Sequence, residues 1–188
     1  MSIRKIQLVL EAFKEVDEEI ANFRKELDLS CLNKCGLCCK NIQIEATVLE
    51  CLPVADFLLK SNQVDKFFNE SSESLSQKYC LFYQEEIPSQ ALGNCTQYEL
   101  RPFICRLFGF AGQLNKFGQA RFSLCKYLKY AKPDLSEIVE KKLKTVKIFP
   151  LFSRSFDLLY NIDPYLVQNR LPINLAIREA IEKLGVNA

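Results

Sequence analysis

The first thirty residues carry apolar side chains at intervals of three and four positions. The stripe consists of Ile6, Leu10, Phe13, Val16, Ile20, Phe23 and Leu27. Side chains at this spacing share one face of a helix, and the opposite face is rich in Glu and Lys. The pattern predicts one long helix over residues 3–27, with its apolar face against the protein core and its charged face in water.

The middle of the chain predicts shorter helices. Residues 47–50 have the spacing of a capping box, in which each end residue accepts a hydrogen bond from the backbone amide of the other. This motif predicts a helix that ends near Lys60, although Pro53 should kink the helix or move its start. Residues 63–78 fit a further helix, and Pro102 is placed to open another one.

Extended segments are expected at three places. Residues 41–45 alternate polar and apolar side chains, and residues 79–83 form a short apolar and aromatic run. The first pattern indicates a short extended segment and the second a buried strand. Residues 108–114 and 119–124 flank residues 115–118, a turn sequence with Asn and Gly that predicts a β-hairpin.

Helical patterns return after Pro133. Four apolar residues predict one helix face, and they are Ile138, Val139, Leu143 and Val146. A second helix is expected over residues 150–161 and a third from Pro172 to Leu184, with Gly185 as the C-terminal stop. Helices therefore dominate the predicted fold, and only the cysteine-bearing centre of the chain is expected to be irregular.

The composition fits one globular domain. The chain has 188 residues, of which 48% are hydrophobic and 26% are charged, and its net charge is +2. These values exclude an intrinsically disordered protein and a strongly cationic binding protein. We expect a single domain over residues 1–188, with an N-terminal helix at 1–30, a cysteine-cluster core at 31–130 and C-terminal helices at 131–188.

Two features of the composition are unusual, namely nine cysteines and no histidine. Without histidine the chain cannot form a Ser-His-Asp triad, a Cys-His nucleophile pair, an H-E-x-x-H zinc helix or a C-x-x-C-H haem attachment. Any metal site must therefore use thiolates, carboxylates or carbonyls. The many thiols favour a site of soft sulfur ligands.

The N-terminal residues predict a cytoplasmic protein. Basic residues come first, but charge returns at Glu11 before the apolar stretch of a secretory signal is complete. No apolar run approaches the ~18 residues of a membrane span. In a reducing cytosol, closely spaced cysteines favour metal ligation over disulfides, and an odd number of cysteines cannot all pair.

The densest group of cysteines has the spacing C-x3-C-x2-C-C. Cys35 and Cys38 form a C-x-x-C turn that lets two sulfurs converge on one metal, and Gly36 eases the backbone into that turn. Cys31 precedes Cys35 by four residues, so one helical turn would bring its sulfur to the same side. Cys39 is expected to point away from Cys38 and not to share its metal, because adjacent side chains usually diverge.

Single cysteines further along the chain complete the candidate set. The eight candidate metal ligands are Cys31, Cys35, Cys38, Cys39, Cys80, Cys95, Cys105 and Cys125. They suffice for two four-thiolate sites or for one site with spare thiols. Cys51 lies in an apolar stretch and is interpreted as a buried small hydrophobic residue.

The segment 96–132 is strongly basic. Glu99 is its only acid, and its basic residues are Arg101, Arg106, Lys116, Arg121, Lys126, Lys129 and Lys132. Four thiolates on a divalent ion leave a charge of about −2, which needs compensation in an interior of low dielectric. We expect this segment to supply counter-charges and a solvated face. A nucleic-acid surface is the alternative, because aromatic residues are interleaved, but the near-neutral chain makes a nucleic-acid partner unexpected.

Together these blocks closely resemble the YkgJ-type cysteine-cluster family. The matching motifs are C-x3-C-G-x-C-C at 31–39, C-x-F at 80–82 and C-x2-Y-x2-R-P-x2-C-R at 95–106. The resemblance covers residues 28–130, and the helix expected at 172–184 is similar to the family's tail. Leu81 departs from the family pattern, because many relatives have proline after this cysteine.

The resemblance implies a domain that chelates zinc or iron, and it does not fix the metal. It suggests every candidate cysteine except Cys125 as part of the cluster. The residues implied around the cluster are Tyr98, Arg101, Pro102 and Arg106. The family also includes relatives of flagellin lysine methylase, which leaves an enzymatic function open.

The predicted fold is mainly α, a helical bundle around a small irregular cysteine-rich metal-binding centre with a short β-hairpin. The predicted function is chelation of zinc or iron, including an iron–sulfur cluster, by cysteine thiolates, with a metal ion as partner and no membrane. One alternative is a cluster-dependent methyltransferase-like enzyme that acts on protein lysine, although the glycines form no nucleotide-binding fingerprint. A second is a redox or regulatory thiol protein, because Lys34, Lys40 and Arg106 could activate nearby thiols.

Overall fold

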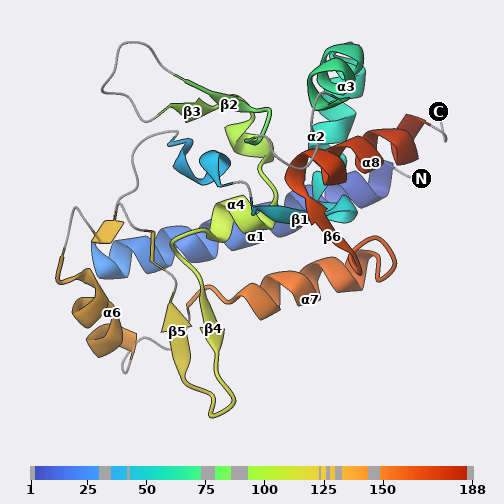
Figure 1. Ribbon diagram of the computed structural model, residues 1–188. Helices are drawn as coiled ribbons and strands as arrows, with labels where there is room; N and C mark the ends of the chain where they lie inside the picture. The colour runs from blue at the N-terminus through green and yellow to red at the C-terminus, as the bar shows by residue number, and fades with distance from the viewer. Residues whose placement is uncertain are drawn as a thin grey trace.

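The computed structural model of the protein describes most of the chain. The described residues are 3–29, 35–41, 43–72, 79–85, 93–122, 124–125, 128–129, 133–143 and 149–185. Helices account for most of them, and the strands form short antiparallel pairs. The fold is therefore mainly α, as predicted, with a β-hairpin that projects away from the helices (Figure 1).

The helices and strands follow one another without a repeat. The α-helices of the described residues are α1 (Ile3–Leu27), α2 (Val48–Lys60), α3 (Val64–Ser72), α4 (Phe103–Leu107), α6 (Leu135–Leu143), α7 (Phe152–Ile162) and α8 (Ile173–Gly185). The 3-10 helices are η1 (Leu37–Lys40) and η2 (Tyr98–Leu100). The strands are β1 (Glu45–Thr47), β2 (Tyr83–Gln84), β3 (Asn94–Cys95), β4 (Gly112–Leu114), β5 (Ala120–Phe122) and β6 (Arg170–Pro172).

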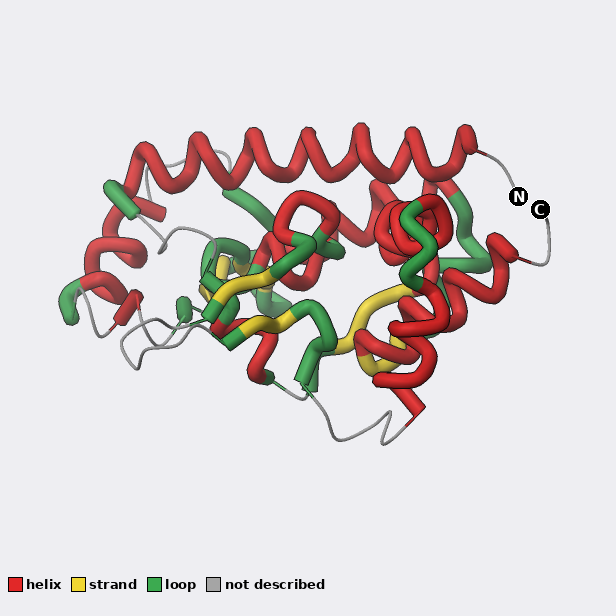
Figure 2. Tube along the Cα trace, turned by 90° about the horizontal axis from the view of Figure 1, so that it is seen from above, coloured by secondary structure: helices red, strands yellow, loops and turns green. Residues whose placement is uncertain are grey.

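Helix α1 runs along one side of the whole molecule (Figure 2). The predicted helix is confirmed over its full length, and its apolar stripe is buried except at Leu10, whose side chain is 39% exposed. Val9 is fully buried instead. The steps from Val9 to Phe13 and Val16 define the centre of the buried face, so Leu10 falls at its edge.

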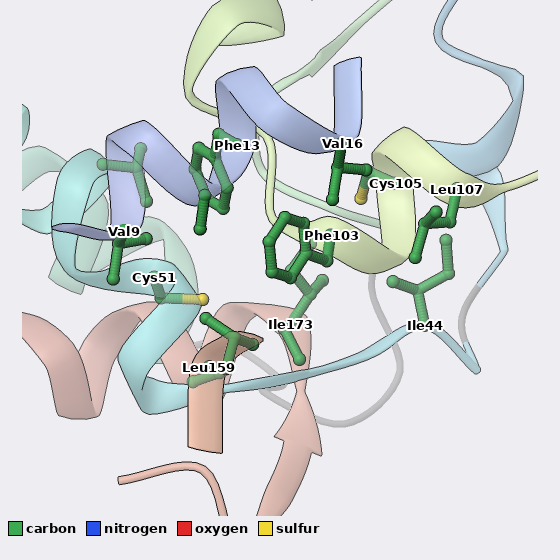
Figure 3. Packing of buried hydrophobic residues seen from close by; sticks show 14 of the residues in the cluster. Val9, Phe13, Val16, Ile44, Cys51, Phe103, Cys105, Leu107, Leu159 and Ile173 are labelled. Carbon is green, nitrogen blue, oxygen red and sulfur yellow. The ribbon is translucent and has the colours of Figure 1, made fainter. Parts of the chain in front are cut away.

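Helix α2 is buried on most sides and packs against α8. The predicted capping box opens it, because the side chains of Thr47 and Glu50 each accept a bond from the other's backbone amide. The helix continues through Pro53, which lacks the amide that would bond to the carbonyl four residues earlier. Cys51 extends from α2 into the core below Val9, which confirms its interpretation as a buried hydrophobic residue (Figure 3).

Strands β1 and β6 join the starts of α2 and α8. They pair antiparallel, with Glu45 opposite Pro172 and Thr47 opposite Arg170. The extended segment predicted at 41–45 is therefore shifted, because only its last residue lies in β1. The register with a three-residue partner, and not the local alternation of side chains, determines where the strand begins.

The buried strand predicted at 79–83 is wrong over most of its length. The Tyr83 amide donates to the Cys80 carbonyl at 2.9 Å and closes a turn, and the Leu81 amide donates to Asn174 Oδ1 at 3.1 Å. Tyr79 is 52% exposed, and only Tyr83 lies in β2. The backbone groups of this run are satisfied by a local turn and by α8, so no strand ladder is needed.

The predicted hairpin is confirmed with shorter strands. Leu114 lies opposite Ala120, and Gly112 lies opposite Phe122. The residues before Gly112 form a turn after α4, in which the amides of Phe110 and Ala111 donate to the Leu107 carbonyl.

The C-terminal helices are confirmed as α6, α7 and α8. Val139 is buried, but Ile138 is 37% exposed, so only part of the predicted face of α6 reaches the core. Val146 lies outside the described residues. No helix of the described ranges is long and apolar enough to cross a membrane.

One hydrophobic core connects the long helices with the cysteine-bearing segments. Residues of α1, α2, α4 and α8 share it, and so do the buried cysteines Cys39, Cys51, Cys80, Cys95 and Cys105. Figure 3 shows Cys105 close to Val16 of α1 in this core. The cysteine-rich centre is therefore an extension of the main core and rests against the middle of α1.

Candidate metal centre

Backbone hydrogen bonds bring three separate cysteine-bearing segments together. The Gly36 amide donates to the Gly93 carbonyl at 3.0 Å, next to an antiparallel bridge between Cys35 and Asn94. The Cys80 amide donates to the Cys39 carbonyl at 3.1 Å. The segment at 35–39 is thus fixed by main-chain contacts to both of the downstream cysteine blocks.

Gly36 is required by this close approach. A Cβ atom at this position would lie 2.9 Å from the Asn94 carbonyl carbon and 3.0 Å from the Asn94 oxygen. These are backbone atoms, which cannot rotate away as a flexible side chain would. The backbone of Gly36 has an ordinary negative φ. Glycine is therefore needed here because a side chain would not fit, and not because the turn requires a positive φ.

Three thiols surround the thiol of Cys39, which lies in the 3-10 helix η1. Cys38 and Cys39 lie in η1, and the Cys39 thiol is within hydrogen-bond reach of the Cys38, Cys80 and Cys95 thiols. The expectation that Cys38 and Cys39 diverge does not hold here. It assumed an extended backbone, in which neighbouring side chains point to opposite faces, whereas η1 is helical.

The thiols in this group have different proton affinities. Hydrogen bonding to its three neighbours, and then burial, raise the pKa of Cys39, so this thiol keeps its proton and donates it. The same bond lowers the pKa of Cys38, against burial and with help from the charge of Arg101. At Cys95 the bond from Cys39 likewise lowers the pKa to about 7, assisted by the Gln97 amide and by Arg101. The protonated Cys39 thiol thus favours the thiolate forms of its two neighbours Cys38 and Cys95.

A cavity of about 230 Å³ lies beside this group of thiols. Four cysteines line it, namely Cys35, Cys38, Cys105 and Cys125. Cys105 is 6% exposed, and both burial and the nearby Cys38, Cys80 and Cys95 raise its pKa well above the usual value. The thiol-lined cavity and the Cys39 group share Cys38, so the two arrangements are continuous.

Arg101 supplies positive charge at the centre. Its guanidinium stacks on the Tyr98 ring, 3.4 Å from the ring centroid, and Nε donates to the Tyr98 carbonyl at 2.7 Å. Both residues line the thiol-lined cavity. This arrangement matches the expected role of the basic segment as a source of counter-charge.

Arg106 has a structural role instead. Its side chain is 3% exposed, pairs with Asp17 of α1, and donates to the carbonyls of Glu99 and Arg101. Its guanidinium also lies 4.2 Å from the centroid of the Phe13 ring. The basic segment is therefore not a single exposed face, because one of its arginines is buried against α1.

The structure describes seven of the eight predicted ligands. Cys31 lies outside the described residues. The remaining seven lie in the thiol-lined cavity or around Cys39, and Cys51 stands apart in the core. Within the described ranges, however, no three Cys, Asp or Glu side chains are arranged so that they could hold a metal ion together.

By its chemistry, this donor set suits a thiophilic metal. The thiols are soft donors, the pKa values of Cys38 and Cys95 are lowered, and the charge of Arg101 favours their thiolate forms. The described side chains form a network of thiol hydrogen bonds and not a coordination shell. Ligation therefore requires Cys39 to release its proton, so that sulfur–metal bonds replace sulfur–sulfur hydrogen bonds.

Two residues of α1 belong to the site although no motif near them in the sequence predicts it. Asp17 and Arg24 line the thiol-lined cavity. They belong to the charged side of α1, which sequence analysis assigned to solvent. Only the packing of α1 across α4 brings them to the cysteines.

A family model matches residues 30–128, and its description is "CxxCxxCC: Putative zinc- or iron-chelating domain". This match spans just over half of the chain and includes all eight candidate ligands. The chain belongs to this family. Three residues separate Cys31 from Cys35 here, one more than in the motif of the description. The assignment supports metal binding by the cysteine-rich domain without distinguishing zinc from iron. No curated protein and no solved structure matches the chain.

Proposed function

We propose that the protein binds zinc or iron through cysteine thiolates of the central domain. The proposed ligands come from Cys31, Cys35, Cys38, Cys39, Cys80, Cys95, Cys105 and Cys125. A single domain, with the N-terminal helix at 1–30 and the C-terminal helices at 131–188, would enclose this centre.

The observation that carries the proposal is the meeting of three sequence blocks at Cys39. Cys38, Cys80 and Cys95 are distant in the chain, yet their thiols surround that of Cys39. A single buried cysteine such as Cys51 is explained by packing alone, but four thiols in mutual contact are the arrangement expected of ligands to one thiophilic metal. Ligation of one metal ion by these thiolates accounts for their meeting.

The chemistry limits the metal to two forms. With no histidine in the chain, a four-thiolate zinc ion and a thiolate-bound iron–sulfur cluster are the centres that the ligands favour. A zinc ion would supply a redox-inert cross-link between the segments, and a cluster would supply an electron-transfer centre.

The test is a determination of zinc, iron and acid-labile sulfide in protein purified without oxygen. We expect about one equivalent or more of metal per chain. Colourless protein with zinc supports a zinc centre, and coloured protein with iron and sulfide supports a cluster. Protein that contains neither metal, and that takes up neither from solution, contradicts the proposal.

Matched variants connect the metal with the site. We expect Cys39→Ser and Cys95→Ser to lose most of the metal, because each removes a thiolate from the group around Cys39. Cys51→Ala is the control, since Cys51 is completely buried in α2 and is not one of the proposed ligands. Equal metal content in all three variants would contradict the proposed ligands.

A second candidate function follows from the acidity of Cys95. A pKa of about 7 gives this buried thiol a thiolate fraction at neutral pH, which is one of the two properties of redox-sensing cysteines, the other being access to solvent. Alkylation of the protein as purified distinguishes the two functions. Rapid modification of Cys95 and Cys38 that metal removal does not change supports a redox thiol, whereas protection that is lost on chelation supports a metal ligand.

A further inference from the structure

A second and larger cavity adjoins the thiol-lined cavity. Its volume is about 1070 Å³, and its lining residues come mainly from η1, α4, β4 and α7, with Arg170 from β6. The two cavities share Leu37, Phe108 and Cys125. Cavities of this size commonly hold a small organic molecule.

The wall of this cavity is mainly apolar. Aliphatic and aromatic side chains converge on it from several elements, and they include Leu37, Ile104, Phe108, Leu124, Phe152 and Phe156. Such a wall favours a ligand with an apolar body, because removing apolar surface of the ligand and the wall from water makes the free energy of binding more favourable. A small hydrophilic ion would leave these side chains in contact with water.

The charged residues of the wall are few. They are Lys40, Asp157 and Arg170. The Lys40 ammonium lies 3.6 Å from a carboxylate oxygen of Glu85 and 5.0 Å from the centroid of the Tyr83 ring, so much of its charge is engaged elsewhere. Arg170 is the second cation of the wall, and unlike Lys40 it forms no salt bridge within the described part of the chain.

Arg170 has only a weak counter-charge within the described part of the chain. Its charge acts on Glu50, which lines a small cavity of about 30 Å³ together with Arg170 and Phe156. Glu50 Oε1 accepts a bond from the Thr47 amide, whereas Oε2 is buried and has no hydrogen-bond partner among the described residues. Burial raises the pKa of Glu50, which favours its neutral form and leaves Arg170 without a full opposite charge.

We propose that the large cavity binds a small organic carboxylate with an apolar body. The carboxylate pairs with the Arg170 guanidinium, and the body lies against Phe152 and Phe156. Asp157 opposes a densely charged anion, and it offers a partner for an amine if the ligand is an amino acid. This binding site goes beyond metal chelation, and it borders the thiol-lined cavity at Cys125.

Titration calorimetry of the full chain tests the proposal with three probes. They are octanoate, octanamide as its neutral match, and L-phenylalanine as a zwitterionic carboxylate. We expect at least one of the two carboxylates to bind. If octanoate binds, the affinity for octanamide should be about tenfold lower. Arg170→Gln should lower the affinity for the carboxylate that binds by about tenfold or more. Arg4→Gln is the control, because it removes an exposed arginine of α1 that does not line the cavity.

Further variants keep the test decisive. Ser153→Glu adds a negative charge at an exposed position of the wall and should weaken carboxylate binding even if Arg170→Gln fails to fold. Asp157→Asn should lower the affinity for L-phenylalanine but not for octanoate. This result would distinguish a site for an amino acid from a site for a simple carboxylic acid.

Two results would overturn the proposal. One is the absence of binding by both carboxylates, and the other is binding that Arg170→Gln and Ser153→Glu both leave unchanged. Metal content, measured in the same samples, reports on the proposed metal centre independently.

Discussion

Thr47 and Glu50 cap the N-terminus of α2 reciprocally. The Thr47 amide donates to Glu50 Oε1 at 2.6 Å, and the Glu50 amide donates to Thr47 Oγ1 at 3.4 Å. Both side chains are buried, so water cannot replace either bond. The same pair also holds the Glu50 carboxyl beside Arg170, and a helix cap thereby forms part of the wall of a cavity.

Loss of the Thr47 hydroxyl is therefore expected to destabilise the fold. Thr47→Ala should lower the free energy of unfolding by about 1 kcal/mol, because one buried amide at the helix start loses its acceptor. Urea denaturation measures the change. Thr47→Ser keeps the hydroxyl and should recover most of the loss, and an equal loss in both variants would argue against the cap.

Substitution of Gly36 should disturb the cysteine centre. Gly36→Ala places a Cβ against the Asn94 backbone, and we expect a loss of about 1–3 kcal/mol in unfolding free energy together with weaker metal binding. Gly185→Ala is the matched control, because a Cβ there meets nothing within 4 Å. Denaturation and metal titration of both variants make the comparison, and equal stability of the two contradicts the close approach.

Arg106 should contribute more to stability than an exposed arginine does. Arg106→Met removes a buried guanidinium that satisfies the carbonyls of Glu99 and Arg101, and we expect a loss of about 2–4 kcal/mol. Arg154, which is half exposed and pairs with Glu15, is the comparison. Arg154→Met should cost less than about 1 kcal/mol. Similar losses in the two variants would show that burial of Arg106 adds nothing.

Asp163 should make stability depend on pH. Burial opposes its charge, but bonds from Lys5 and from the amides of Leu166 and Tyr165 lower its pKa below the usual 3.8. Because the unfolded chain binds this proton more readily, the stabilisation is present above pH 3.8 and is lost as the pH falls through the lower pKa of the folded state.

The expected difference between wild type and Asp163→Asn follows from this sign. At neutral pH the variant should be less stable by about 1 kcal/mol, and the difference should shrink as the pH falls below 3.8. Denaturation of both proteins at the two pH values measures it. A difference that grows on acidification would contradict the lowered pKa.

Removal of a bound metal should loosen the segments that it joins. The backbone bonds from Cys80 to Cys39 and from Gly36 to Gly93 join the same segments that a shared ion would link. On the proposed function, a chelator should lower the melting temperature of wild type and of Cys51→Ala alike. The same treatment should have little effect on Cys39→Ser. A melting temperature that chelation leaves unchanged in metal-loaded wild type would contradict a structural contribution.

Local patterns were sufficient for the regular elements. The stripe of α1 and the capping box of α2 were predicted correctly because their interactions join residues three or four positions apart. The strand prediction at 79–83 failed because the backbone of this run bonds within a turn, to Cys39 and to Asn174, and Asn174 lies more than ninety positions away. Patterns within a short stretch of sequence do not predict a hydrogen-bond partner so far along the chain.

By itself, the sequence determined the chemistry of this protein. It supplied thiols without histidine, the spacing of the cysteine blocks and the helical periodicity, all of which are properties of residue types and short intervals. Only the tertiary structure decided which thiols meet at Cys39, why Arg106 faces Asp17 and how Arg170 comes to border a cavity. These relationships depend on the packing of α1 and on the pairing of β1 with β6, which join residues distant in the chain only when the whole core has formed.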